Sequence, residues 1–204
     1  DWQNHPERAS KVVNADGTPK VVYHGTLAHG LHEFKKSFIG SRFSFDETGF
    51  FFTDNKSLAQ DYATGDFDNS KGEVIPAYLN VRRPLVFDSQ YALKNGYGKV
   101  FRENDAVDVW DAYQGAILDE AQEMRADGII VNDGTSEMVV VFEPNQIKSA
   151  TDNVGTFNRY NPDIRFSASA EQISEQDREN LNKVLEMMDA EGDGIFRDAV
   201  LLRN

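Results

Sequence analysis

The chain has 204 residues, a formal net charge of −13, 40% hydrophobic residues and no cysteine. The missing cysteines exclude disulfides and thiolate metal sites. The acidic balance opposes a general nucleic-acid-binding surface, because neutralising phosphates needs clustered Lys and Arg. No apolar run reaches the roughly 18 residues that a membrane span needs. These limits favour a soluble globular domain with a sizeable core and no membrane partner.

The N-terminal part of the chain predicts a loop, a strand and a second loop. Residues 1–18 form a lead-in with a turn signal at Asn14–Gly17, and β-branched and aromatic residues dominate a strand at Lys20–His24. This strand ends at Gly25. Residues 27–48 show no sustained period, which predicts a long loop of the kind that is commonly functional.

A basic insert within this loop stands out against the acidic chain. Lys35, Lys36 and Arg42 outnumber Glu33 here. A solvated surface loop is the favoured interpretation. The alternative is that the insert, Arg42 included, contacts the phosphates of a small ligand.

The middle of the chain predicts a buried strand followed at once by a helix. Gly49–Thr53 is an aromatic run after glycine, Asp54 is a good N-cap, and Tyr62 lies on the following helical stripe. Further strands are predicted at Glu73–Val81 and Pro84–Phe87, and a helix at about 105–124.

Three short apolar runs follow, and they predict closing strands at Gly128–Val131, Glu137–Phe142 and Ile147–Ala150. Short strands joined mainly by turns, with few helices, favour an α+β fold over a doubly wound parallel sheet. We expect one domain over residues 11–166. Residues 167–204 then form a linker and a helical tail, which packs on the domain or leads to a further module of a longer polypeptide.

The predicted tail contains a segment that resembles the start of a calcium-binding loop. Asp189–Gly194 places oxygen ligands at alternate positions and glycine sixth, but Val200 stands at the twelfth position, where such loops carry a bidentate acid. We interpret it as a helix-terminating turn and expect no metal.

Three motifs in order give the chain a resemblance to a known fold. They are Tyr23-His24-Gly25-Thr26, then Gly49-Phe50-Phe51-Phe52-Thr53 with Tyr62 thirteen residues after the glycine, and Ser136-Glu137-Met138-Val139-Val140-Val141-Phe142. They resemble the His-Tyr-Glu branch of the ADP-ribosyltransferases, which contains diphtheria toxin and the poly(ADP-ribose) polymerases. The residues within these motifs, together with Asn161–Phe166 downstream, are most similar to those of ADP-ribosyltransferase domains in phage polyvalent proteins. The resemblance implies a split antiparallel β-sheet.

The resemblance also implies an NAD⁺ site. It places His24 on a ribose hydroxyl and the backbone of Gly25 on the nicotinamide amide, with Thr26 beside them. Phe51 and Tyr62 correspond to two aromatic walls that hold the nicotinamide ring between them. Glycine suits its position physically, because without Cβ a ligand can lie against the main chain.

Two positions depart from the family pattern. Phe51 lacks the hydroxyl of the tyrosine that usually forms the first wall, although an aromatic face still stacks. Ala59 replaces a serine that often holds the amide. Amide recognition is then expected to rest more on Gly25.

Glu137 is the predicted catalytic carboxylate. Breaking the nicotinamide–ribose bond builds positive charge on the ribose, as glycoside cleavage does, and a carboxylate beside it stabilises that charge. The resemblance places Glu137 at the ribose 2′-hydroxyl. The apolar run after it predicts a central strand with Glu137 at the rim.

The expected function is therefore mono-ADP-ribosyl transfer from NAD⁺, without a metal, to a macromolecular acceptor. By analogy with the phage domains, the acceptor is a protein of the bacterial host cytoplasm, and the chain acts as a monomer or as part of a longer polypeptide. The alternatives are NAD⁺ hydrolysis, modification of a nucleic acid, and a catalytically inactive module that binds NAD⁺ or a partner.

Overall fold

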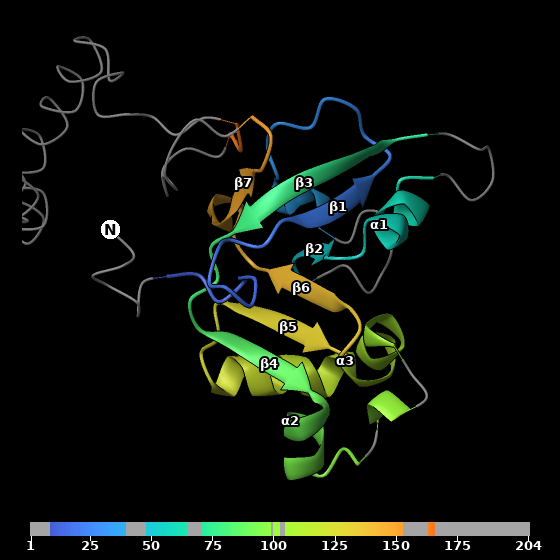
Figure 1. Ribbon diagram of the computed structural model, residues 1–204, viewed down its shortest axis with the longest axis vertical. Coiled ribbons are helices and arrows are strands. Elements are labelled where there is room, and N and C mark those ends of the chain that lie inside the picture. Colours follow the sequence, from blue (N-terminus) through green and yellow to red (C-terminus); the bar gives the residue numbers. More distant parts are fainter. Residues whose placement is uncertain are drawn as a thin grey trace, which may run out of the picture. The chain divides into compact units, whose positions relative to one another are not determined.

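The computed structural model describes residues 9–39, 48–64, 71–98, 100–102, 105–152 and 163–165. In these ranges a seven-stranded sheet has the order β4-β5-β6-β2-β1-β3-β7 (Figure 1). Its strands are β1 Val22–Thr26, β2 Phe50–Thr53, β3 Glu73–Leu79, β4 Pro84–Asp88, β5 Gly128–Asn132, β6 Glu137–Val141 and β7 Ile147–Ser149. The α-helices are α1 Lys56–Tyr62, α2 Ser89–Lys94 and α3 Ala106–Glu123. The predicted α+β class is confirmed.

The strand directions refine the predicted antiparallel sheet. Every neighbouring pair is antiparallel except β4 and β5, which run parallel. A parallel pair needs a long crossover, and here α2 and α3 supply it. The sheet is therefore mixed rather than wholly antiparallel.

The sheet is split between β1 and β2. β1 pairs with β3 at five positions and β2 pairs with β6 at four, whereas β1 and β2 pair only at Tyr23 and Thr53. Beyond that pair the ladder between the two strands is interrupted. The split that the resemblance implied is thus present.

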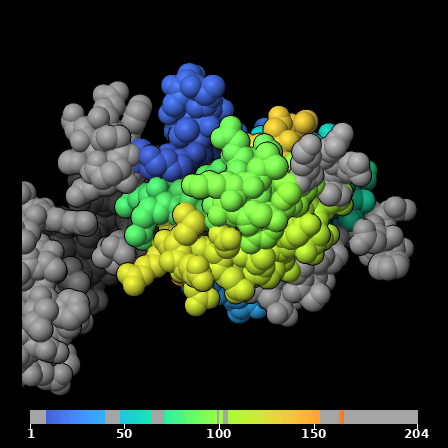
Figure 2. All heavy atoms as spheres, turned by 90° about the horizontal axis from the view of Figure 1, so that it is seen from below, coloured from blue at the N-terminus to red at the C-terminus, as the bar shows by residue number. Residues whose placement is uncertain are grey.

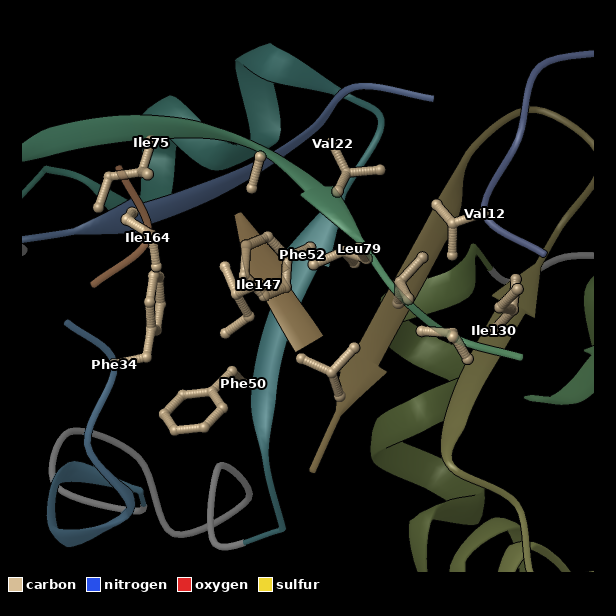
Figure 3. Packing of buried hydrophobic residues seen from close by; sticks show 14 residues of the cluster. Val12, Val22, Phe34, Phe50, Phe52, Ile75, Leu79, Ile130, Ile147 and Ile164 are labelled. Carbon is tan, nitrogen blue, oxygen red and sulfur yellow. The ribbon is translucent and has the colours of Figure 1, made fainter. Parts of the chain in front are cut away.

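Strand alternation divides the buried residues into two cores. On β2, Phe50 and Phe52 join a first core on one face, while Phe51 contacts a second core on the other face. Ile164 and Phe34 lie in the first core beside Phe52 (Figure 3). The second core lies beneath α2 and α3, whose green and yellow atoms form the face seen in Figure 2.

Most predicted elements agree with the structure to within two residues at each end, but the prediction that Asp54 caps α1 was wrong. Asn55 caps this helix by accepting hydrogen bonds from the backbone N–H groups of Ser57 and Leu58. The Asp54 carboxylate instead accepts a 2.8 Å bond from the backbone N–H of Glu137. Asp54 therefore ties β2 to β6, the strand that carries the predicted catalytic carboxylate.

Helix α2 was not predicted from the sequence. It has six residues, capped by Asp88, whose side chain accepts a hydrogen bond from the backbone N–H of Tyr91. So short a helix gives little periodic signal. The predicted linker, helical tail and calcium-like turn lie outside the described residues, so the proposed division at residue 166 stays a prediction.

Candidate active site

A cavity of about 580 Å³ lies at the split between β1 and β2. Its lining comes from β1, the loop after it, β2, α1 and the first turns of α3. Five of the predicted site residues line it, namely His24, Gly25, Thr26, Phe51 and Tyr62. The volume is in the range that small-molecule sites occupy.

One wall of the cavity is aromatic and lies on the side of α1 and α3. It contains Phe51, Tyr62 and Trp110, and the rings of Phe51 and Trp110 meet edge to face with centroids 5.2 Å apart. Asp111 lies on the same side. Burial first, and then the nearby Asp108 and Asp105, raise the pKa of the Asp111 carboxyl group.

Gly25 has a packing role that the sequence did not reveal. A Cβ atom at this position would overlap the backbone carbonyl oxygen of Ala59 and lie 2.9 Å from Cβ of Tyr62. Glycine is therefore required because α1 lies directly against β1. This contact fixes the helix that carries Tyr62.

His24 bridges the split from the opposite face. Its Nδ1 lies 2.8 Å from the carbonyl oxygen of Phe51, and its ring packs against Phe34 and Phe52, with centroids 5.0 and 5.4 Å away. A carbonyl only accepts, so Nδ1 carries the proton and Nε2 of the neutral ring is an acceptor. Burial lowers the pKa of His24, and the bond to Phe51 opposes this only in part. The neutral ring can therefore accept a hydrogen bond from a hydroxyl group.

A short downstream segment holds the loop over His24. Backbone N–H of Ile164 donates to His32, and the Ile164 carbonyl accepts from Ser149 on β7. The Lys148 ammonium, fully buried, donates to the carbonyl oxygen of Asp163 at 3.1 Å. Residues 163–165 thus join the sheet edge to the loop that places Phe34 on His24.

Glu137 lies at the start of β6 and is not among the residues that line the cavity. Its Oε2 accepts from Lys20 Nζ at 2.6 Å, and its Oε1 accepts from Asn132 Nδ2 at 2.8 Å. Lys20 also lies 3.7 Å from Asp54. The neighbouring Met138 does line the cavity. β6 is central, as predicted, with β5 and β2 on its two sides.

The basic insert is only partly described, and Arg42 lies outside the described residues. Lys35 lines the cavity and forms an ion pair with Glu33 at 3.5 Å. Lys36 pairs with Glu143. Two of the predicted phosphate-binding cations are therefore paired with acids.

Sequence reasoning missed three residues at the site. Trp110 gave a signal, because an aromatic residue sat beside the predicted buried stripe of its helix. Lys20 and Phe34 gave none, because each acts through a partner distant in the sequence.

The surroundings of His24 predict that the folded protein loses stability in acid. The unfolded chain titrates near pH 6.5 at His24, whereas burial lowers the pKa in the folded protein. Below that pH the unfolded state binds the extra proton, so stability falls as the pH drops, by up to about 1.4 kcal/mol per pH unit for one proton. His24→Asn keeps a donor near Nδ1 without this titration. In urea unfolding, the drop in the free energy of unfolding from pH 7.5 to pH 5.5 should be smaller in the variant than in the original protein. Equal drops in the two proteins would contradict the neutral ring of His24.

The described part of the chain holds no group of three or more metal-ligating side chains. None of the helices described is long and apolar enough to cross a membrane.

Comparison with known proteins gives one family. The sequence model described as "ADP-Ribosyltransferase in polyvalent proteins" matches residues 14–157. Searches of curated proteins and of solved structures return no match. The matched segment contains the three motifs and every described cavity residue. The chain therefore belongs to the family of ADP-ribosyltransferases in polyvalent proteins.

Proposed function

We propose that this domain cleaves NAD⁺ at the nicotinamide–ribose bond and transfers one ADP-ribose to a macromolecular acceptor. The observation that carries the proposal is the cavity at the β1–β2 split, which gathers His24, Gly25, Phe51 and Tyr62. Membership of the family supports ADP-ribosyl transfer in general. The cavity supports a donor with a planar ring.

The nicotinamide ring would occupy the aromatic wall. Phe51 on β2 and Tyr62 on α1 offer two ring faces, and Gly25 on β1 packs directly against α1. On the other side of the split, Nε2 of His24 would accept a hydrogen bond from a ribose hydroxyl. The donor would thus pass through the split.

Glu137 would stabilise the positive charge that develops on the ribose. The C–N bond breaks with its electron pair on the ring nitrogen, so nicotinamide leaves neutral, and the acceptor then bonds to the same carbon and gives up its proton. Lys20 and Asn132 each bond one carboxylate oxygen and so fix its orientation. Because Glu137 lies just outside the cavity lining, we infer that it acts at the rim.

We further propose that the acceptor is a protein of a bacterial host cytoplasm. The family description, which places these domains in polyvalent proteins, supports a phage context. Single transfer is proposed because a domain of this size has little surface for a second substrate on which a polymer could grow.

Incubation with NAD⁺ labelled in its adenylate part and a bacterial lysate tests this proposal. A labelled protein supports transfer to protein, and a labelled nucleic acid would redirect the acceptor. Free labelled ADP-ribose without a labelled acceptor would instead indicate hydrolysis. No consumption of NAD⁺ by the folded protein would contradict both reactions.

The aromatic wall makes a separate prediction at Tyr62. Tyr62→Leu should weaken NAD⁺ binding about two- to tenfold, because stacking on an aromatic face contributes about 0.5–1.5 kcal/mol. Tyr62→Phe keeps the ring and should bind within about twofold of the original protein, by the same stacking argument. Calorimetric titration measures both. Equal affinity of the leucine and phenylalanine variants would remove Tyr62 from the ring-binding wall.

A further inference from the structure

Asp111 brings an unpaired negative charge to the cavity wall. Two other charged side chains line the cavity, Glu33 and Lys35, and they form an ion pair with each other at 3.5 Å. Asp111 is exposed on α3, and within the described part of the chain no hydrogen bond or ion pair engages its side chain. Burial lowers the pKa of His24, so that ring adds no positive charge. The described lining therefore carries a net negative charge, which comes from Asp111.

The stability of α3 does not explain why an acid stands at this position. Asp105 caps the helix and Asp108 lies in its first turn, where the helix dipole favours negative charge. Asp111 lies one turn further on, where this benefit has faded, and it is three residues from Asp108, a like charge on a neighbouring position. Burial, and then the charges of Asp108 and Asp105, raise the pKa of its carboxyl group. A locally unfavourable charge on a cavity wall is expected where a ligand makes use of it.

An aromatic wall with a carboxylate beside it suits a flat organic cation. Phe51 and Tyr62 line the same cavity and are only partly buried. The faces of aromatic rings attract cations, and a carboxylate attracts them by its charge. In NAD⁺ the nicotinamide ring is the part that carries positive charge, since adenine is neutral and the phosphates are negative. The composition of the wall therefore matches the oxidised nicotinamide ring.

We propose that Asp111 recognises the positive charge of the nicotinamide ring and so makes the site prefer NAD⁺ to NADH. The proposal rests on the proposed function, since it concerns the same donor substrate. The two forms share the ribose groups, the phosphates and the adenine, and they differ in the charge of one ring. NADH lacks the cationic leaving group that the transfer needs, so this preference keeps an unreactive ligand out. Nicotinamide leaves neutral, so the attraction to Asp111 ends when the bond breaks.

The test compares the oxidised and reduced forms of an NAD⁺ analogue that has a carbocycle in place of the nicotinamide ribose and so cannot be cleaved. Each form is titrated by calorimetry against the original protein, Asp111→Asn and Asp119→Asn. Asp119 is the matched control, because it is an exposed acid of the same helix that does not line the cavity. Loss of one negative charge changes the attraction for the phosphates equally in both forms. The ratio of the two affinities therefore isolates the effect of the ring charge.

Asp111→Asn should lower the ratio of oxidised to reduced affinity about two- to fivefold, the range for an ion pair exposed to solvent, and Asp119→Asn should leave the ratio unchanged. The effect of Asp111→Asn should shrink as salt is added. An unchanged ratio in Asp111→Asn, whether both affinities fall or neither does, would overturn the proposal and leave the proposed function standing. An equal change of the ratio in Asp119→Asn would overturn it as well. If the folded original protein binds neither form, the donor site fails, and the proposed function fails with it.

Discussion

Glu137→Gln should lower the rate of nicotinamide release from NAD⁺ about 10²–10³-fold, the usual cost of removing one preorganised electrostatic group. The amide keeps the shape of the carboxylate, but it has a single oxygen and so can keep only one of the two bonds, the one from Lys20 or the one from Asn132. It removes the negative charge that the developing cation needs. NAD⁺ binding should change far less than the rate, because the charge on the ribose develops only as the bond breaks. Single-turnover release and calorimetric binding measure the two quantities.

Glu123→Gln is the matched control for that experiment. This residue ends α3, is exposed and undergoes the same chemical change away from the cavity. Its release rate should equal that of the original protein. A Glu137→Gln variant that releases nicotinamide at the original rate would show that the catalytic carboxylate is another residue.

Gly25→Ala should destabilise the domain by about 1–3 kcal/mol or more, the range for forcing extra atoms into a well-packed contact. The added Cβ meets the backbone oxygen of Ala59, which cannot rotate away as a flexible side chain could. Helix α1 must then move off β1, and Tyr62 moves with it. The free energy of unfolding in urea should fall, and NAD⁺ affinity should fall with it.

Gly115→Ala is the control for this variant: it makes the same change of glycine to alanine, but it should raise stability. Gly115 lies on the exposed side of α3, and a Cβ there meets nothing within 4 Å. Alanine favours a helix interior over glycine by up to about 1 kcal/mol, so this variant should gain stability. If Gly25→Ala were as stable as Gly115→Ala, the close approach of α1 to β1 would be wrong.

Local sequence signals predicted most of the strands. The run Phe50-Phe51-Phe52 shows why, since its alternation sends Phe51 to one core and its neighbours to the other. The strand order and the parallel pair of β4 and β5 were not predictable in this way. They depend on which strands meet across a crossover, and no local pattern records that.

The residues of the cavity differ in the same way. His24, Phe51 and Tyr62, which line it, were predicted because each belongs to a motif with a fixed spacing. The ion pair of Lys20 with Glu137 joins residues 117 positions apart, and no local sequence pattern at either residue predicts it. The role of Gly25 in packing against α1 likewise needed the structure.

Where NAD⁺ lies can be read from backbone amide resonances when a non-hydrolysable analogue, with a carbocycle in place of the nicotinamide ribose, is added to the labelled protein. The largest shifts are expected at Gly25, Phe51 and Tyr62, around the split between β1 and β2. The amide resonances of α2, which packs beside β4 at one end of the strand order, should not shift. Shifts confined to another face, or no shifts at saturating analogue, would contradict the placement of the donor in this cavity.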